Sequence, residues 1–532
     1  MPTNAQLTDE YLALVAERGG DAQGRLAARE HMNNSTAIYH HVVVDSSYVP
    51  RLYSRETYER FAYIAETTYS ILSKVMREYL ENPSYRHVYD IDPRLVELIL
   101  LPRGYDALLP FARVDLFLNE DDMSAQFCEF NADGSSGMNE NREITASIAN
   151  SEPFKAFAAA HQVRTCNEEL FAGWVDEFLK IYDTYDLKVA NPHVAIVDFL
   201  ENAITEEFKI FAGLFAERGI ECSVYDVRDL AFENGELIGK KAFYGRDNAK
   251  IDAIWRRSVT NDIIDNWEAS QALISAVRER KVALIGSFAG HLVHDKQIFQ
   301  VLYMPETQAL LTDEENAFVR DTVPFTSFLT SDVVAERNVK ATRENWIIKP
   351  TDAYGSKDVF AGSNYTDEQW VEIVDAHVDS KAGAPFLVQR YCTPFKTLAI
   401  PLYGTEADAT VKPSPYNNME GLYIYNGRFT GVFSRLGPEP VICKKTHGIT
   451  AATIWVDEKR VFVAHRDERC GRDFGGGIGR EPYRGRLCGV RRARRFHQGA
   501  CERLFDRRRL AVHERRARRG RGANETLHHR RQ

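Results

Sequence analysis

Short apolar runs alternate with helix-patterned segments between residues 193 and 290, and this alternation limits the possible folds more than any other feature of the sequence. The run HVAIVDF is followed by a helical pattern that reaches Phe215, and Gly219 ends it before a second run, ECSVYDV. A later helical pattern, ALISAVRER, precedes the run VALIGSF. Strands that alternate with helices are typical of parallel sheets. We therefore predict an open, largely parallel α/β domain over about 190–290.

The segments on either side have other periods. Residues 54–81 carry apolar side chains at spacings of three or four, which predicts an amphipathic helix, and we expect the first 110 residues to be mainly helical. ARVDLFLN and SAQFCEFNA, joined by the acidic turn EDDM, predict a β-hairpin. Residues 345–456 are predicted to be rich in sheet. The predicted strands there are WIIKP, FLVQRY, LAIPLYG, GLYIYNG and RFTGVFSRLG.

The net charge of −9 averages two different segments. Residues 461–532 contain 21 Arg, no Lys and 8 Asp and Glu, which gives +13, so the preceding 460 residues carry −22. Three interpretations of this tail are open: a change of reading frame in a GC-rich gene, a disordered extension, or an arginine-rich arm that binds nucleic acid. The Arg, Gly and Ala composition favours the first. We therefore do not expect nucleic acid as a partner.

Other composition features exclude whole classes of protein. No uninterrupted apolar stretch reaches the roughly 18 residues that span a bilayer, and the sequence begins without a basic and then apolar leader. The eight cysteines include no CxxC pair, which fits reduced thiols better than a zinc ribbon or a disulfide framework. We expect a cytoplasmic protein with no membrane partner. The sequence leaves the oligomeric state open.

The hairpin contains the first candidate site. Arg113 and Asp115 share one face of the first strand, and Glu129 and Asn131 share one face of the second, because strand residues alternate with period two. Two carboxylates and an amide oxygen suit Mg²⁺, and a guanidinium can stabilise a transferring phosphoryl group. The alternative is an exposed, salt-bridged strand face. The same alternation places Cys128 on the opposite face, and we predict that it is a core residue.

A second candidate site follows the strand WIIKP. Lys349 lies at its end, and the next loop contains Lys357 between Gly355 and Gly362, so both lysines could contact nucleotide phosphates. No Walker A motif is present. FLVQRY at 386–391 could be the strand whose backbone reads an adenine edge. For both segments the alternative is an ordinary buried strand and turn.

The order of these motifs resembles that of the circularly permuted ATP-grasp ligases, and the glutathionylspermidine synthase-like proteins in particular. The resemblance covers roughly residues 35–456, and the RxD…ExN hairpin is its most specific part. It implies a mixed α/β fold: a permuted ATP-grasp core with an inserted Rossmann-like pre-ATP-grasp domain. The implied parts are a helical N-terminal region (1–110), the Mg-binding part of the core (111–189), the pre-ATP-grasp domain (190–290), the lid and nucleotide-binding sheets (291–460) and the Arg-rich tail (461–532).

The resemblance also implies roles for individual residues. Arg113 and Arg435 would be catalytic, and Mg²⁺ would be held by Asp115, Glu129 and Asn131. ATP would be bound by Lys349, Lys357, Gln389, Arg390 and Tyr391. Ser135, Ser136 and Gly137 would lie near an acyl phosphate. The lid sequence AYGSKDVFAG departs from the family's glycine-rich pattern through Tyr354 and Phe360.

The implied function is ATP- and Mg²⁺-dependent amide formation between a small-molecule or peptide carboxylate and an amine, through an acyl phosphate. The alternatives are a catalytically degenerate nucleotide-binding protein, or nucleic-acid binding through the tail. Arg256 and Arg257 could bind an acidic substrate or form structural ion pairs. His40 with His41, and His291 with His294, are not expected to bind a metal, because no third ligand lies near them in the sequence.

Overall fold

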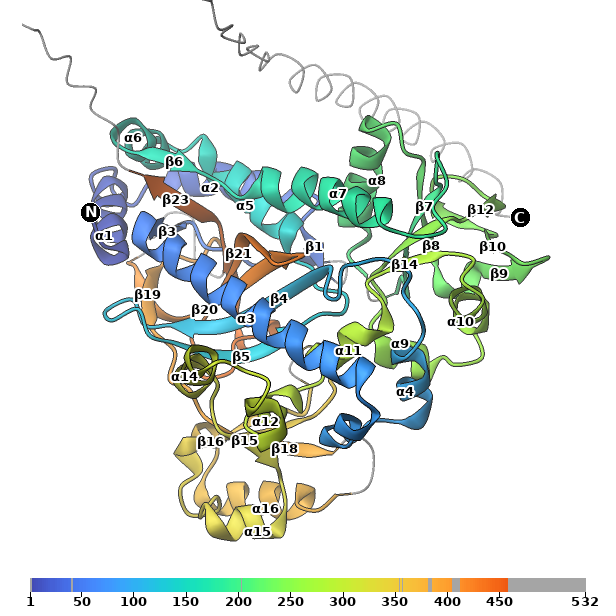
Figure 1. The fold of residues 1–532 in the computed structure, drawn as a ribbon. Coiled ribbons are helices and arrows are strands. Elements are labelled where there is room, and N and C mark those ends of the chain that lie inside the picture. Colours follow the sequence, from blue (N-terminus) through green and yellow to red (C-terminus); the bar gives the residue numbers. More distant parts are fainter. Residues whose placement is uncertain are drawn as a thin grey trace, which may run out of the picture. The chain divides into compact units, whose positions relative to one another are not determined.

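The computed structural model describes residues 2–39, 42–201, 203–353, 355, 357–380, 385–403 and 412–457. The predicted tail, His40, His41 and the lid residue Tyr354 lie outside these ranges. No helix within them is both long enough and apolar enough to cross a bilayer. The described chain mixes helices with several sheets, so the predicted mixed α/β class is confirmed (Figure 1).

The N-terminal region is mainly helical, as predicted. Its helices are α1 (Asn4–Ala16), α2 (Ala22–Asn33), α3 (Arg55–Glu81) and α4 (Pro93–Ile99), and its strands are β1 (Ile38–Tyr39), β2 (Val42–Val43) and β3 (Arg51–Ser54). Ser54 caps α3 by accepting a hydrogen bond from the Thr57 amide. The predicted apolar stripe of α3 is buried at Phe61, Leu72 and Met76. Helix α3 lies across the central sheet (Figure 1).

The central sheet is antiparallel and joins strands that are 300 residues apart in the sequence. Its order is β22-β21-β20-β4-β5, with β19 paired to β20. The strands are β4 (Phe111–Leu118), β5 (Ala125–Asn131), β19 (Lys396–Ala399), β20 (Ser414–Tyr425), β21 (Arg428–Gly437) and β22 (Ile449–Ala451). Ala112, Val114 and Leu116 belong to the apolar cluster beneath α3. Alternation along β4 therefore directs Arg113 and Asp115 to the other face.

The predicted parallel sheet is present between residues 194 and 285. Its order is β11-β8-β7-β13-β14, in which β11 alone is antiparallel. The strands are β7 (Val194–Asp198), β8 (Cys222–Asp226), β11 (Ala242–Tyr244), β13 (Ala253–Arg256) and β14 (Ala283–Ile285), with helices α8 (Thr205–Glu217) and α10 (Gln271–Arg278). A small sheet of β9 (Leu230–Glu233), β10 (Glu236–Gly239) and β12 (Ala249–Lys250) turns at Asn234 and Gly235, both with positive φ.

A four-stranded sheet with order β15-β18-β16-β17 follows. It consists of β15 (Thr326–Phe328), β16 (Trp346–Pro350), β17 (Phe360–Ala361) and β18 (Phe386–Arg390), with helices α15 (Ser331–Glu336) and α16 (Asp367–His377). Ile348 and Val388 belong to the same apolar cluster as Trp370 of α16. The period of two therefore directs Lys349 and Gln389 to the face away from α16.

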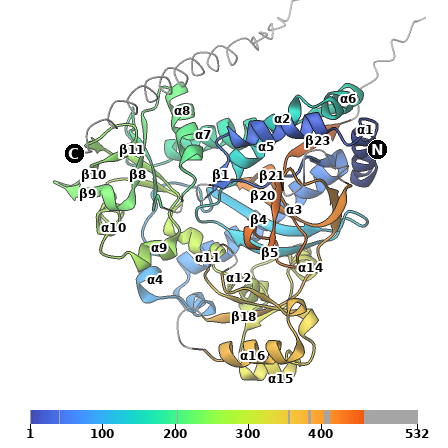
Figure 2. The same cartoon turned by 180° about the vertical axis from the view of Figure 1, so that it is seen from behind.

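The remaining elements connect these sheets. The helices are α5 (Met138–Ala149), α6 (Glu152–Ala160), α7 (Asn167–Asp183), α9 (Thr260–Asp265), α11 (His291–His294), α12 (Ile298–Val301), α13 (Pro305–Gln308) and α14 (Asp313–Thr322). β23 (Thr453–Asp457) runs parallel to β3 and antiparallel to β6 (Gln162–Arg164), so it joins the two ends of the described chain. Figure 2 shows α2 lying along α5.

Candidate active site

The hairpin β4–β5 places four predicted site residues side by side. Arg113 is the cross-strand partner of Asn131, and Asp115 is the partner of Glu129. A register shift follows, because Leu116 pairs with Phe127 and Cys128 is left over as a bulge. The prediction that Cys128 is a core residue is therefore wrong. The extra residue breaks the alternation, and Cys128 lines the same cavity as Glu129.

Arg113 and Asp115 form a buried ion pair. Arg113 Nε donates to Asp115 Oδ1 at 2.7 Å and Nη2 donates to Oδ2 at 3.1 Å, and Asp115 is 0% exposed. Arg435, on β21, donates to the same carboxylate at 2.6 Å. A side chain at position 421 would collide with this pair, since a Cβ built on Gly421 lies 2.7 Å from Asp115 Oδ1. The alternative of an exposed, solvated strand face is excluded.

Glu129 lies among positive charges. Burial by itself raises the pKa of this carboxyl, but Lys296, Arg435, Lys349 and Arg113 outweigh it and hold the pKa at about 2. Arg435 Nη2 lies 4.0 Å from Glu129 Oε1. Burial and the neighbouring Lys296 lower the pKa of Lys349. Four cationic side chains therefore surround two carboxylates, which leaves the cluster with an excess of positive charge.

Lys349 bridges the four-stranded sheet and the hairpin. Its Nζ donates to the Cys128 carbonyl at 3.0 Å, and the side chain is 3% exposed. The bulge thus offers a backbone acceptor to the lysine predicted to bind phosphates. Lys349, Glu129 and Arg435 all line one cavity between the central sheet and the four-stranded sheet.

The predicted nucleotide-binding strand lines the same cavity. Gln389, Arg390 and Tyr391 all contribute to its wall, together with Met419 from β20. The amide of Arg390 already donates to the Phe325 carbonyl at 2.8 Å, and that of Tyr391 donates to the Asn345 carbonyl at 2.8 Å. Any donor to an adenine edge must therefore come from another group of this wall.

Lys296 is a site residue that the sequence patterns did not reveal. It lines the cavity, and its Nζ donates to the Ala353 carbonyl at 2.8 Å while its amide donates to the Thr351 carbonyl at 2.9 Å. It therefore fixes the loop that follows β16. Lys357 lies farther along that loop, is exposed, and is not part of the cavity wall that the structure describes. A lysine beside His294 and Asp295 at the start of a helix pattern has the appearance of an ordinary surface residue.

The hairpin offers a donor set that suits Mg²⁺. Asp115, Glu129 and Asn131 carry oxygen atoms of the hard kind that Mg²⁺ prefers. Both Asp115 oxygens accept from arginines, and the buried unpartnered atom of Asn131 is Nδ2, a donor, so Glu129 is the residue of the three that lines the cavity. Within the described residues, no group of three or more His, Cys, Asp and Glu is arranged to hold a metal. A cation held here would draw its other ligands from phosphates and water, as Mg²⁺ commonly does.

Two further arginines, Arg256 and Arg257, are buried and contact other protein groups. Arg256 donates to the carbonyls of Gly286 and Ser258 and forms an ion pair with Asp133, and it is 4% exposed. It therefore has no surface to offer a substrate. Arg257 is also buried, beside Glu207 at 3.4 Å and over the Trp255 ring. The hypothesis that Arg256 binds an acidic substrate is wrong.

The loop after β5 is held against the face of the central sheet that carries Arg113 and Asp115. Arg113 Nη1 and the Tyr423 hydroxyl both donate to the Ser136 carbonyl at 2.7 Å, and Gly137 caps α5 with φ 105°. A Cβ at Gly137 would lie 2.9 Å from the Phe433 ring, which explains the glycine. Ser135 lies in the same loop and is buried.

His291 and His294, on α11, are both buried, and within the described residues neither ring nitrogen of His294 has a hydrogen-bond partner.

The chain is similar to known proteins in its fold and not detectably in its sequence. No family model and no curated protein matches the sequence. The structure is similar to the apo form of a glutathione synthetase-like effector from Globodera pallida, with a TM-score of 0.53 and 11% identity over 81% of this chain and 96% of that chain. A protein from Methylobacillus flagellatus, provisionally assigned as a gamma-glutamylcysteine synthetase, aligns over 73% of this chain and 88% of that chain at 12% identity, with a TM-score of 0.37. The chain therefore has the mixed α/β fold of a glutathione synthetase-like protein.

Proposed function

We propose that this chain is an ATP- and Mg²⁺-dependent carboxylate–amine ligase that forms an amide bond through an acyl phosphate. The proposal includes a circularly permuted ATP-grasp core of the glutathionylspermidine synthase-like type. The synthetase-like fold supports a ligase in general. The site supports the more specific chemistry.

One observation carries the proposal: cationic side chains outnumber carboxylates in the wall of a single cavity. Lys296, Lys349 and Arg435 line this cavity with Glu129, and Arg113 adjoins them through Asp115. The excess positive charge suits a polyphosphate, since charge-assisted contacts to phosphate oxygens would neutralise it. A protein nucleophile is not needed, because phosphoryl transfer relies on positioning and electrostatics.

Each group has a role in this scheme. Lys349 and Lys296 bind the nucleotide phosphates, and the wall formed by Gln389 to Tyr391 borders the base. Arg113 and Arg435 stabilise the charge that develops when a substrate carboxylate attacks the γ-phosphorus. Asp115, Glu129 and Asn131 would hold Mg²⁺, which supplies charge neutralisation on the phosphate oxygens when bound.

The substrates belong to two chemical classes. One is a small molecule or peptide with a free carboxylate, and the other is an amine that attacks the acyl phosphate. Glutathione and spermidine are the pair that the sequence resemblance suggests. A degenerate site that binds nucleotide without turnover remains the competing function, and the same experiment decides between them.

The test is ADP release by the full-length protein with MgATP and a panel of acids, which are glutamate, γ-glutamylcysteine and glutathione, with hydroxylamine, glycine, cysteine or spermidine as the nucleophile. We expect acid-dependent ADP release that Glu129→Gln lowers by about 100-fold or more. Asp121→Asn makes the same carboxylate-to-amide change in the exposed turn of the hairpin and should have no effect. MgATP binding without ADP release for any pair would favour the degenerate site, and no MgATP binding at all would refute both.

A further inference from the structure

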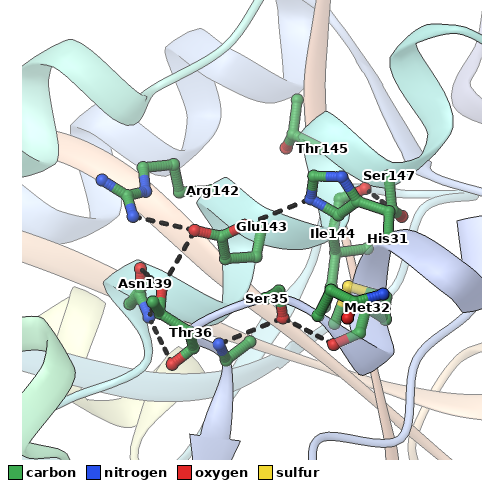
Figure 3. Close-up of polar contacts among 12 residues, drawn as sticks. His31, Met32, Ser35, Thr36, Asn139, Arg142, Glu143, Ile144, Thr145 and Ser147 are labelled. Carbon is green, nitrogen blue, oxygen red and sulfur yellow. Dashed lines mark hydrogen bonds and ion pairs between the residues drawn. The ribbon is translucent and has the colours of Figure 1, made fainter. Parts of the chain in front are cut away.

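Helix α5 carries two carboxylates nearly one turn apart that have different surroundings. Glu143 is fully engaged: it accepts from Thr36 Oγ1 at 3.0 Å and from Arg142 Nη2 at 2.8 Å, and its Oε2 lies 3.1 Å from His31 Nε2 (Figure 3). These contacts attach α2 and the loop after it to α5. Glu143 is thus a structural residue.

Glu140 has no such partners. It is 9% exposed, and its one hydrogen bond in the described part of the chain is a 3.4 Å contact from Thr450 Oγ1 to Oε2. No described cation forms an ion pair with it. Burying a carboxylate without an ion-pair partner costs free energy, and buried acidic groups are usually paired, so Glu140 is an unusual residue in a core.

Glu140 lies on the catalytic face of the central sheet. Its helix begins directly after the loop whose Ser136 carbonyl accepts from Arg113, and Thr450 is the cross-strand partner of Arg435. Glu140 does not belong to the wall of the nucleotide cavity. It is therefore linked to Arg435 through Thr450, and it lies within electrostatic reach of both arginines, without being part of the nucleotide site.

The electrostatic surroundings of Glu140 suit proton transfer. Burial raises the pKa of its carboxyl, repulsion from Glu207 raises it further, and attraction to Arg435 and Arg113 limits the rise, so the pKa is about 7. Glu207 itself accepts from the Asn139 amide and adjoins Arg257. A base with a pKa near the working pH is the most effective in general base catalysis.

We propose that Glu140 is the general base that accepts the proton of the attacking amine. This inference rests on the proposed ligase function. The amine nitrogen bonds to the acyl carbon, the bond between that carbon and the phosphate oxygen breaks, and one N–H proton passes to the Glu140 carboxylate. The carboxyl then returns this proton to the departing phosphate or to water, so atoms and charge balance. The other carboxylates beside the catalytic arginines, Asp115 and Glu129, are committed to cations.

Hydroxylamine separates this step from the formation of the acyl phosphate. It is largely unprotonated at neutral pH and traps acyl phosphates as hydroxamates with little need for a base, whereas an alkyl amine does need one. For Glu140→Gln we therefore expect hydroxamate formation close to that of the wild type. Amide formation with the best amine among glycine, cysteine and spermidine should fall by about 100-fold or more. Glu143→Gln, the matched change on the same helix, should leave the ratio of amide to hydroxamate unchanged.

Each other outcome has a definite meaning. If Glu140→Gln forms amide at the wild-type rate, or loses both products together, Glu140 is not the base and the inference is overturned. If the wild type forms hydroxamate but no amide with any of these amines, there is no amine step for Glu140 to serve, and the inference is again overturned. If the wild type forms neither product, the ligase function itself is refuted.

Discussion

Two buried clusters of arginine and carboxylate serve different purposes in this chain. At the end of the parallel sheet, Arg256 uses its donors on Asp133, Thr260 and backbone carbonyls, so the network is closed. At the hairpin, Arg113 and Arg435 share one carboxylate, Asp115, and further cations face a cavity. A buried ion pair by itself therefore does not identify a site. The cluster at the hairpin differs because its additional cations line a cavity.

The closed cluster should carry the larger share of stability. Arg256→Met leaves Asp133 buried without its cation, and we expect the free energy of unfolding to fall by about 3 to 5 kcal/mol. Urea denaturation followed by circular dichroism measures this loss. A decrease below about 1 kcal/mol would show that the cluster is not closed, since only an exposed pair is worth so little.

The open cluster should instead carry activity. Arg113→Met is expected to lower acid-dependent ADP release by about 100- to 1,000-fold, because it removes a group that stabilises the transferring phosphoryl charge. Arg435 still pairs with Asp115 in this variant, so the free energy of unfolding should fall less than in Arg256→Met. If Arg113→Met were unstable but still active, the hairpin cluster would contribute to stability rather than to activity, which would contradict this account.

Two lysines outside the strands, one inside the open cluster and one beyond it, should differ. Lys296→Met removes a cation from the cavity wall, and we expect MgATP to bind about 10-fold more weakly or worse, measured by isothermal titration calorimetry. Lys357→Met is the control, because Lys357 is exposed and lies outside the described wall. A larger effect at Lys357 would mean that the loop after β16 closes over the nucleotide and brings this lysine to the phosphates.

The stability of the protein should also change with pH through Glu129. The cations lower its pKa from 4.5 to about 2 in the folded state, so the stabilisation is present above pH 4.5 and is lost as the pH falls towards 2. The difference in free energy of unfolding between the wild type and Glu129→Gln should therefore shrink across this range. A difference that stays constant from pH 6 to pH 3 would contradict the positive surroundings of Glu129.

Much of the fold follows from patterns that are local in the sequence. The helix over 55–81, the hairpin and the parallel strands each follow from a period of 3.6 or 2. The strand predicted at LAIPLYG begins earlier, at Lys396, and ends at Ala399, before Pro401. A proline has no amide to donate to a ladder, so this boundary could have been seen.

The sequence patterns did not predict those features of the site that depend on contacts between distant segments. The bulge at Cys128 cannot be recognised from the sequence of its strand, because a single extra residue shows only in the register with β4. The closed network of Arg256 depends on Asp133, which is 123 residues away. Glu140 lies in a helix whose pattern is amphipathic, and only the packing of β22 against this helix shows that no cation of the described chain forms an ion pair with it.

The transfer of oxygen from the acid to phosphate tests the ligase mechanism most directly. The acid that supports ADP release is labelled with ¹⁸O in its carboxylate, and the phosphate released during amide formation is analysed by mass spectrometry. An acyl phosphate requires that each phosphate carries one ¹⁸O atom, because the oxygen that attacked the γ-phosphorus leaves with it. Unlabelled phosphate, released in step with amide, would contradict carboxylate activation at this site.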